Sequence, residues 1–393
     1  MLDKELTSCL KSVKTPSYVF NIDEFHQRAA LVHSVFGDNI GLCFSIKANP
    51  FLIKALPDCI EKLEVCSPGE LDICIGTGAD MKSIIFSGVN KSYADVEKAF
   101  LSGVVTFTAE SLNHLSYINA AGEKFGTKID VLLRVSAETQ FGMDEQIVRW
   151  IIAERESYPY VNIVGLHYFT GTQKKRAKQI EREMDYLSSL IDSIRSDYQF
   201  TVERVEYGTG LYVEYFSQNG DEDEAALLNA VAPSLKRLSE KTALTVEMGR
   251  FFAAGCGYYF TKVVDCKKND GINFAICDGG MHQLHYDGQI QGMKIPSISH
   301  LRVNEASDGN APEKWTLCGS LCTTADVIVR DVELASLSEG DVLVFKKTGA
   351  YSHMEGMSIF LSRDLPQIWL TSEKDGMALQ RDSMLAFSFN MPK

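Results

Sequence analysis

The sequence lacks any apolar run of the roughly 18–20 residues that a membrane-spanning helix needs. Its first twenty residues also lack the apolar segment of a secretory signal, so we expect none. Basic residues are too few for a nucleic-acid partner, because 39 Lys and Arg face 52 Asp and Glu and leave a net charge of −13. The ten cysteines include no CxxC pair, so we expect no metal site and a cytoplasmic protein with reduced thiols.

What is present is ordinary for globular proteins. Hydrophobic residues make up 45 % of the chain and charged residues 23 %, which excludes a disordered chain, a collagen and a coiled coil. A length of 393 residues favours two domains, or one large barrel with a smaller partner.

The first two thirds of the chain alternate between apolar runs and helix-like stretches. Eight runs rich in Val, Ile, Leu and Phe have the pattern of parallel strands buried on both faces. Eight such units predict a (β/α)8 barrel, although an open doubly wound sheet would show the same periodicity. The predicted strands are 41–47, 63–66, 83–86, 104–108, 130–135, 161–169, 204–207 and 244–247.

Beyond about residue 262 the pattern changes to strands joined by Gly, Asp and Asn clusters, which predicts an all-β half. A strand-like segment near residue 17 precedes the first helical stretch. We therefore predict an α/β fold, with a barrel domain at 24–262 and a β-domain formed by 1–23 and 263–393. The predicted C-terminal strands are 258–264, 273–277, 297–303, 315–317, 326–333, 342–345 and 359–361.

Residues that carry chemistry stand where the predicted barrel strands end, which is where barrel enzymes place their sites. Lys47 ends the first strand. It is either a lysine that extends toward solvent or an amine activated by desolvation for Schiff-base chemistry. The turn 208–210 (Gly-Thr-Gly) could bind an anion through its backbone N–H groups or only serve as a tight turn.

Two more strand ends add to this set. Residues 247–250 (Glu-Met-Gly-Arg) offer a carboxylate and a guanidinium, or a local ion pair at the barrel rim. Residues 167–173 (His-Tyr-Phe-Thr-Gly-Thr-Gln) bring aromatic and hydroxyl groups. A lysine, a stacking ring, an anion-binding turn and a carboxylate are the groups that pyridoxal phosphate needs.

With these motifs in this order, the chain resembles the fold-type III pyridoxal-phosphate decarboxylases, the family of diaminopimelate and ornithine decarboxylases with the alanine racemase fold. The resemblance runs from Thr15 to about Trp369. It implies a barrel that binds pyridoxal 5'-phosphate, a C-terminal β-domain and a homodimer with shared active sites.

The resemblance also implies roles for single residues. Lys47 in SIKANP would bind the cofactor covalently, and Glu247 in EMGR would keep its ring nitrogen protonated. Cys322 in CGSLCTTAD would reach across the dimer interface to return a proton to the substrate, or is one more buried thiol. Glu64 and Arg134 fall near the cofactor, or form a rim ion pair. The residues implied to hold the phosphate are Thr172, Gly208, Gly210, Gly249, Arg250 and, from the β-domain, Tyr351.

The chain departs from the family pattern at two places. Phe169 takes the position of a histidine that stacks on the cofactor, which leaves His167 as a residue of the barrel interior. Thr323 follows Cys322 where relatives have an acidic residue, and a neutral hydroxyl cannot pair with the distal ammonium of a diamino acid.

The motifs GGMHQ and Cys-Thr resemble a branch that acts on conjugated substrates, such as a glutamyl carrier protein or a citryl-diaminopropionate siderophore intermediate. His282 and His285 would contact an acidic or acylated arm of the substrate, or are ordinary loop residues. The run 174–176 (Lys-Lys-Arg) is a candidate basic patch for a carrier protein, or a solvated helix start.

The sequence thus predicts a decarboxylase of a conjugated amino acid, with a free diamino-acid decarboxylase as the alternative. A racemase is disfavoured because Cys322 stands where a tyrosine base would. A non-catalytic relative is disfavoured because Lys47, Glu247, Arg250 and Cys322 are all present.

Overall fold

The computed structural model describes residues 1–216, 224–303 and 311–392, which separate into two compact units. We call residues 26–213 and 224–252 the barrel unit, and residues 1–25, 214–216 and 253–392 the sheet unit. The domain boundaries predicted from the sequence, with a barrel at 24–262, stay a proposal.

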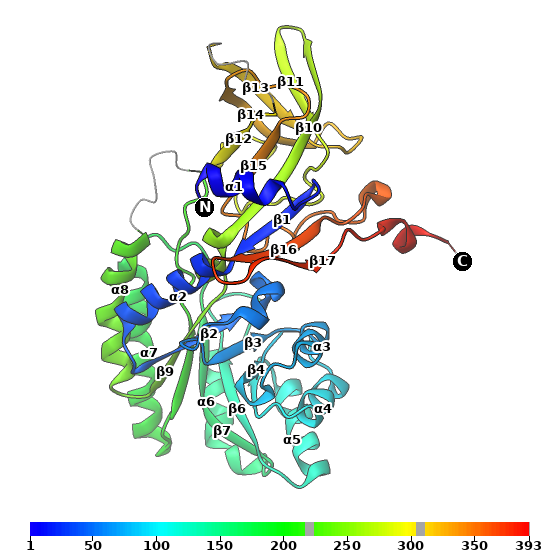
Figure 1. Ribbon diagram of the computed structural model, residues 1–393. Helices are drawn as coiled ribbons and strands as arrows, with labels where there is room; N and C mark the ends of the chain where they lie inside the picture. Colours follow the sequence, from blue (N-terminus) through cyan, green and yellow to red (C-terminus); the bar gives the residue numbers. More distant parts are fainter. Residues whose placement is uncertain (217–223, 304–310, 393) are drawn as a thin grey trace. The chain divides into compact units, whose positions relative to one another are not determined.

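The barrel unit contains a closed barrel of eight parallel strands in chain order, with helices around its outside (Figure 1). Strand β2 closes the ring by pairing with β9 from Ile40↔Leu244 to Phe44↔Met248. The predicted (β/α)8 barrel is therefore confirmed, and each predicted strand overlaps an observed one. Strands β2 to β9 are Ile40–Ser45, Lys62–Val65, Ile84–Phe86, Thr106–Ala109, Ile129–Val135, Val161–Phe169, Arg204–Gly208 and Ala243–Met248.

Several of the surrounding helices begin at a capping serine or end at a glycine. Ser67, Ser92 and Ser111 cap three helices, because each side chain accepts a hydrogen bond from a first-turn N–H. Gly78 and Gly126 end two of these helices in the left-handed conformation. Helices α2 to α9 are Ile22–Phe36, Pro68–Thr77, Tyr93–Leu101, Leu112–Phe125, Glu145–Ala153, Ala177–Tyr198, Glu224–Ser239 and Arg250–Ala253; short 3₁₀ turns are Ile46–Ala48, Pro50–Ala55, Met81–Ser83 and Arg155–Ser157.

The barrel interior is apolar in one part and charged in another. Buried Cys43, Ile85, Leu132 and Val164, from β2, β4, β6 and β7, pack into one small apolar cluster. Ionisable side chains lie further along three of these strands, toward the carboxyl ends: Lys47 four positions after Cys43, Arg134 two after Leu132 and His167 three after Val164. Such side chains are costly to bury without partners, so their contacts mark the part of the barrel where function is expected.

The sheet unit is built on a mixed sheet with the order β14-β13-β11-β10-β1-β16-β17, in which β15 pairs with β10 and β12 pairs with β15. Strand β1 joins antiparallel β10 and parallel β16, so both ends of the chain contribute to one sheet. The strands are β1 Ser17–Asn21, β10 Gly257–Asn269, β11 Ile272–Cys277, β12 Ile298–Leu301, β13 Glu313–Cys318, β14 Val327–Leu334, β15 Val342–Lys346, β16 Gln367–Ser372 and β17 Gly376–Arg381.

Two features of this unit differ from the prediction. Helix α1 (Asp3–Leu10) packs Leu6 and Cys9 into the same core as Val19 and Phe260, so the unit is not purely β. The strand predicted at 359–361 is wrong, because residues Phe360–Ser362 form a 3₁₀ turn. Leu361 has a φ of +56° there, a left-handed backbone that no strand uses. The other short 3₁₀ turns are Ala254–Cys256 and Ala386–Asn390. None of the helices in the described part of the chain is long and apolar enough to cross a membrane.

Candidate active site

The carboxyl ends of the parallel strands gather the predicted catalytic residue Lys47 and two of the predicted cofactor-binding residues at one edge of the barrel. Lys47 follows β2 in the turn Ile46–Ala48, and Glu64 and Glu247 lie on β3 and β9, the two strands that flank β2. The Lys47 ammonium bonds to Glu64 and lies 3.5 Å from Oε1 of Glu247. Its side chain is 37 % exposed, so this amine is both paired with carboxylates and accessible.

Glu247 is a buried carboxylate that the surrounding groups keep ionised. The Ser45 hydroxyl donates to its Oε1 at 2.8 Å, and Nε2 of His167 lies 3.2 Å from its Oε2. Burial alone would raise the pKa of Glu247, but the charge of Lys47 and the contact with His167 hold it well below the usual range. A negative charge is therefore fixed inside the barrel, beside an accessible amine.

A thiol completes the surroundings of this lysine. Sγ of Cys66 lies 3.5 Å from the Lys47 ammonium and 3.0 Å from Oε1 of Glu64. Burial raises the pKa of Cys66 well above its usual value, and the negative charge of Glu64 adds to the rise. The thiol is therefore neutral beside the amine rather than a competing nucleophile.

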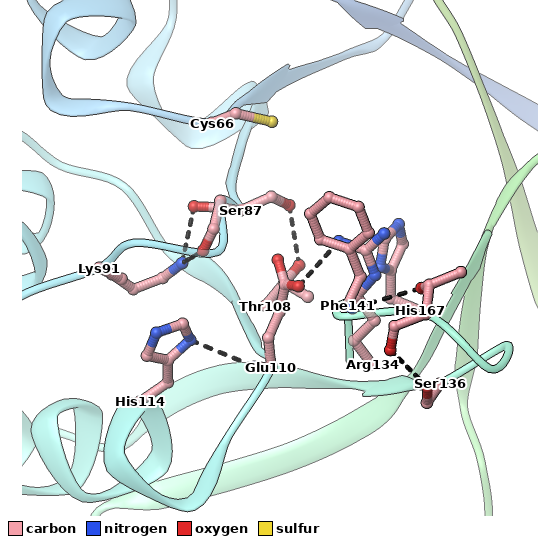
Figure 2. Close-up of polar contacts among 12 residues, drawn as sticks. Cys66, Ser87, Lys91, Thr108, Glu110, His114, Arg134, Ser136, Phe141 and His167 are labelled. Atoms are coloured by element: carbon pink, nitrogen blue, oxygen red, sulfur yellow. Dashed lines mark hydrogen bonds and ion pairs between the residues drawn. The ribbon is translucent and has the colours of Figure 1, made fainter. Parts of the chain in front are cut away.

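Arg134 is held by a second polar group on the wall formed by β4, β5 and β6 (Figure 2). Its Nη1 lies 2.9 Å from Oε2 of Glu110, and its guanidinium lies 4.8 Å from the centre of the Phe141 ring. Lys91, in the same group, donates to the backbone oxygens of Ser87 (2.6 Å) and Gly88 (2.9 Å). Burial lowers the pKa of Lys91 to about 8, although Glu110 opposes the shift.

The turns after β7 and β8 touch each other. A Cβ on Gly208 would lie 2.4 Å from the ring of Phe169, and one on Gly210 would lie 1.9 Å from the backbone oxygen of Gly171. Thr172 follows Gly171 in the same turn. Only glycine fits at these two positions, because a side chain would overlap the neighbouring turn.

Gly249 and Arg250 complete the predicted phosphate cradle in sequence. Gly249 lies between the end of β9 at Met248 and the start of α9 at Arg250. We keep the term phosphate cradle for Thr172, Gly208, Gly210, Gly249 and Arg250, which all lie at or just after the carboxyl ends of β7, β8 or β9.

The other predicted residues lie in the sheet unit, where two segments are joined through Asp326. The Asp326 carboxylate accepts from the N–H groups of Met281 and Leu321, both at 2.8 Å. It thereby connects the turn that precedes His282 to the loop of exposed Cys322.

A third segment of the sheet unit lies against the first. The backbone N–H of His285 donates to the Ser352 oxygen at 3.1 Å, and its imidazole lies 3.3 Å from Glu355. Tyr351 adopts a left-handed backbone with a φ of +65°. His282 is buried, and burial together with the charge of Arg363 lowers its pKa to about 4. Its imidazole is therefore neutral at pH 7.

Sequence reasoning missed several partners of the predicted residues. Glu110 directly follows β5, so the strand-end rule that found Lys47 could have found it. Ser45 and Glu206 lie within apolar strands and gave no signal. Lys174, placed in a candidate surface patch, is only 3 % exposed and pairs with Glu183.

These residues fit pyridoxal phosphate. The turns at Gly208 and Gly210 leave no room for side chains, and the buried Thr209 hydroxyl between them has no hydrogen-bond partner in the described part of the chain. A phosphate oxygen would satisfy such a donor, and the open backbone suits an anion. Lys47 and the ionised Glu247 suit the aldehyde and the ring nitrogen. The barrel and this constellation define a pyridoxal-phosphate enzyme of the barrel type.

Residues 22–254 match the family described as "Pyridoxal-dependent decarboxylase, pyridoxal binding domain", and the chain belongs to this family. The L-glutamyl-[BtrI acyl-carrier protein] decarboxylase of Niallia circulans is 29 % identical over 385 residues, which cover 92 % of this chain and 90 % of that protein. The 2-[(L-alanin-3-ylcarbamoyl)methyl]-2-hydroxybutanedioate decarboxylase of Staphylococcus aureus is 27 % identical over 382 residues, with coverage of 91 % and 94 %.

Diaminopimelate decarboxylases are similar as well. That of Pseudomonas aeruginosa is 26 % identical over 356 residues, which cover 86 % of this chain and 83 % of that protein. The crystal structure of the M. jannaschii enzyme in complex with L-lysine matches with a TM-score of 0.85 at 23 % identity, over 98 % of this chain and 94 % of that one, which shows a shared fold. The predicted family, decarboxylase class and cofactor are therefore confirmed.

Proposed function

We propose that this chain removes the α-carboxylate of an amino-acid moiety whose distal end is conjugated, either N-acylated or bound to a carrier, in siderophore or secondary-metabolite biosynthesis. The observation that carries the proposal is the neutral Thr323 after Cys322, since a conjugated distal end needs no acidic partner. The names of the Niallia circulans and Staphylococcus aureus relatives, which specify a glutamyl carrier protein and an amide-linked alanine, support it.

The proposal assigns each barrel residue a role. When bound, pyridoxal phosphate supplies an electron sink for the bond between the α-carbon and the carboxylate. Lys47 would hold the cofactor covalently and release it to the substrate amine. Glu247 would hold a proton at the ring nitrogen, because an ionised carboxylate favours the protonated form of a neighbouring base. Glu64 and Arg134 would shape the surroundings of the cofactor, Phe169 would stack on its ring, and the phosphate cradle with Tyr351 would bind its phosphate.

Cys322 would give its thiol proton to the α-carbon after CO2 leaves. The carbon–carbon bond breaks, its electron pair stays on the α-carbon, and the thiol proton joins that carbon. The exposed position of Cys322 in the sheet unit supports a role toward a second subunit, and we propose a homodimer with shared active sites.

The surroundings of Thr323 support a conjugated substrate. Asp326 is the nearest acidic residue in the sequence, but its carboxylate already accepts two backbone N–H bonds and is buried. It therefore cannot turn to a substrate ammonium without leaving those donors unpaired. A neutral acyl or thioester group makes no such demand.

His282 and His285 would contact the acyl arm in this proposal. A buried neutral His282 can donate one hydrogen bond to a carbonyl but adds no positive charge. His285, whose imidazole lies 3.3 Å from Glu355, is the better candidate for an acidic arm.

A free diamino-acid decarboxylase is the second candidate, because the diaminopimelate decarboxylases also match over most of the chain. To distinguish them, CO2 release by the holoenzyme would be measured by mass spectrometry across a substrate panel. The panel holds ornithine, lysine, meso-diaminopimelate, citryl-diaminopropionate and a glutamyl-loaded carrier protein. Turnover confined to the last two supports the proposal, and fast turnover of a free diamino acid makes the second candidate correct.

Thr323→Asp tests the residue that carries the argument. It should raise kcat/KM for free diamino acids relative to the preferred conjugate by about tenfold or more, because it adds the missing counter-charge. Thr324→Asp, at the exposed neighbouring position, is the matched control and should leave that ratio unchanged. An unchanged ratio in both variants would remove Thr323 from substrate selection.

A further inference from the structure

Behind the phosphate cradle lies a buried ion pair that the decarboxylase chemistry does not use. The Lys174 ammonium donates to Oε2 of Glu183 on α7 at 2.7 Å, and both side chains are less than a tenth exposed. Thr170 donates to the other oxygen of Glu183 at 2.8 Å, and the Tyr207 hydroxyl donates to Oε2. One carboxylate therefore connects the turn after β7, the last residues of β8 and helix α7.

The backbone of Lys174 joins the same two turns a second time. Its N–H donates to the oxygen of Gly210 at 2.8 Å, and its oxygen accepts from the N–H of Tyr212 at 3.2 Å. The neighbouring Gln173 amide makes two further bonds to Val213, at 2.9 and 3.3 Å. Lys174 thus forms an isolated parallel bridge with Leu211, and the Gln173 side chain adds two bonds beside it.

The side chain of Lys174 also lies near the rings on both sides of this junction. Its ammonium is 5.5 Å from the ring centre of Tyr207 and 6.0 Å from that of Phe169, within the range of cation–π attraction. Burial lowers the pKa of Lys174, and the bond to Glu183 offsets that cost. Burying two charges costs desolvation free energy that an apolar pair would not. We therefore expect the contribution of this pair to be the fixed geometry that a fully hydrogen-bonded pair gives.

We propose that the Lys174–Glu183 pair is the positioning unit of the phosphate cradle. It fixes the turn that holds Thr172 against the turn that holds Gly208 and Gly210, so that both face the phosphate of the cofactor together. The proposal rests on the proposed cradle. It states that these two residues determine affinity for the phosphorylated cofactor, while affinity for the unphosphorylated ring depends on Lys47 and Glu247.

The test is to titrate cofactor-free protein with pyridoxal phosphate and with pyridoxal, and to follow absorbance for the dissociation constant of each. Lys174→Met and Glu183→Gln should each weaken the binding of pyridoxal phosphate by about tenfold to a hundredfold, because small displacements of binding groups have effects of this size. The affinity for pyridoxal should change little. Arg149→Met is the matched control, because Arg149 contacts the same helix α7 at Ser193 and Asp197. It should leave the ratio of the two constants at the wild-type value.

A single variant that leaves one buried charge can fail to fold. The double variant Lys174→Met with Glu183→Leu removes both charges and restores an apolar filling, so it should fold and still lose the preference for the phosphorylated form. A wild-type ratio in the double variant overturns the proposal. Thr172→Ala separates the cradle assignment from the positioning role. If Thr172→Ala reduces the preference for pyridoxal phosphate over pyridoxal and the double variant does not, the cradle stands and the positioning role is wrong. If neither variant reduces this preference, the cradle assignment is wrong too.

Discussion

Two buried glutamates on neighbouring strands of the barrel carry opposite protonation states. Glu247 on β9 is held ionised by Lys47 and His167, which together outweigh burial. For Glu206 on β8, the charge of Lys47 also acts to lower the pKa, but its effect is smaller than the effects that raise it. Burial first, and then the negative charges of Glu247 and Glu64, raise its pKa well above the usual value. The same residue type therefore supplies a fixed negative charge at one position and a neutral group at the next.

The same substitution at both positions should give different results. Glu247→Gln should lower kcat by about a hundredfold to a thousandfold, because it removes a preorganised charge from the reacting centre. Glu206→Gln should keep kcat within about a factor of three, since an amide resembles a protonated carboxyl in size and polarity. Steady-state CO2 release at pH 7.5 measures both. An equal loss in the two variants would mean that Glu206 is also ionised.

The protonation of Glu206 also predicts a pH dependence of stability. A carboxyl whose pKa is raised on folding takes up a proton when the chain folds above its ordinary pKa, so its contribution to stability is lost as pH rises toward the folded pKa. The Tm of the Glu206→Gln variant should therefore fall less than that of the wild type as the pH rises from 5 to 8. Parallel Tm curves for the two proteins would contradict the raised pKa.

The sequence could indicate the reactive residues of the site but not the residues that position them. Lys47 and Glu247 stand at strand ends, where a barrel places its site, and were found by that rule. Lys174 was misassigned to the surface because it begins a basic run. Its partner Glu183 lies on a helix, and pairing across an intervening turn leaves no periodic signal in the chain.

At the scale of elements, the turn after β8 combines a left-handed backbone with a close approach. Gly210 has a φ of +57°, and its Cβ position lies 1.9 Å from the oxygen of Gly171. Gly126, which ends α5, has a similar φ of +64° but nothing within 4 Å. The two glycines share one backbone conformation but have different surroundings. Comparing a side chain introduced at each position therefore separates the effect of conformational strain from that of steric overlap.

Alanine at these two glycines should therefore have different consequences. Gly126→Ala should cost about 1–2 kcal/mol of stability through strain alone and leave affinity for pyridoxal phosphate unchanged. Gly210→Ala should also push the turns after β7 and β8 apart, and it should weaken the binding of pyridoxal phosphate by about tenfold or more. Urea unfolding and cofactor titration measure the two quantities. Equal cofactor affinity in both variants would remove Gly210 from the phosphate cradle.

The sequence pattern predicted the barrel strands and β1, but it missed two strands near the C-terminal end of the sheet unit. The eight barrel strands are rich in buried apolar residues, so each gave a clear signal. Strands β16 and β17 were missed, since β17 is mostly exposed and β16 depends on pairing with β1 from the other end of the chain. The apolar run at 359–361 was assigned to a strand, but its left-handed residues turn the chain instead.

At the scale of the whole molecule, the net charge of −13 bears on the form of the substrate. An acidic carrier protein approaching this chain is repelled, whereas a small conjugate is affected much less. The run 174–176 no longer offers a full basic patch, because Lys174 is buried against Glu183. The surface charge therefore favours a small conjugate over a carrier-bound one unless another basic surface recruits the carrier.

Ionic strength distinguishes these two forms of the conjugated substrate. With a glutamyl-loaded acidic carrier protein, kcat/KM should rise severalfold as salt increases, because the screening length falls from about 30 Å at 0.01 M to about 8 Å at 0.15 M. With the glutamyl thioester of a small uncharged thiol, kcat/KM should stay nearly flat, since no second protein surface is involved. Stopped-time CO2 release over this range of NaCl measures both. If kcat/KM for the carrier-bound form falls with salt instead, attraction by a local basic surface dominates, and a carrier protein becomes the favoured form of the substrate.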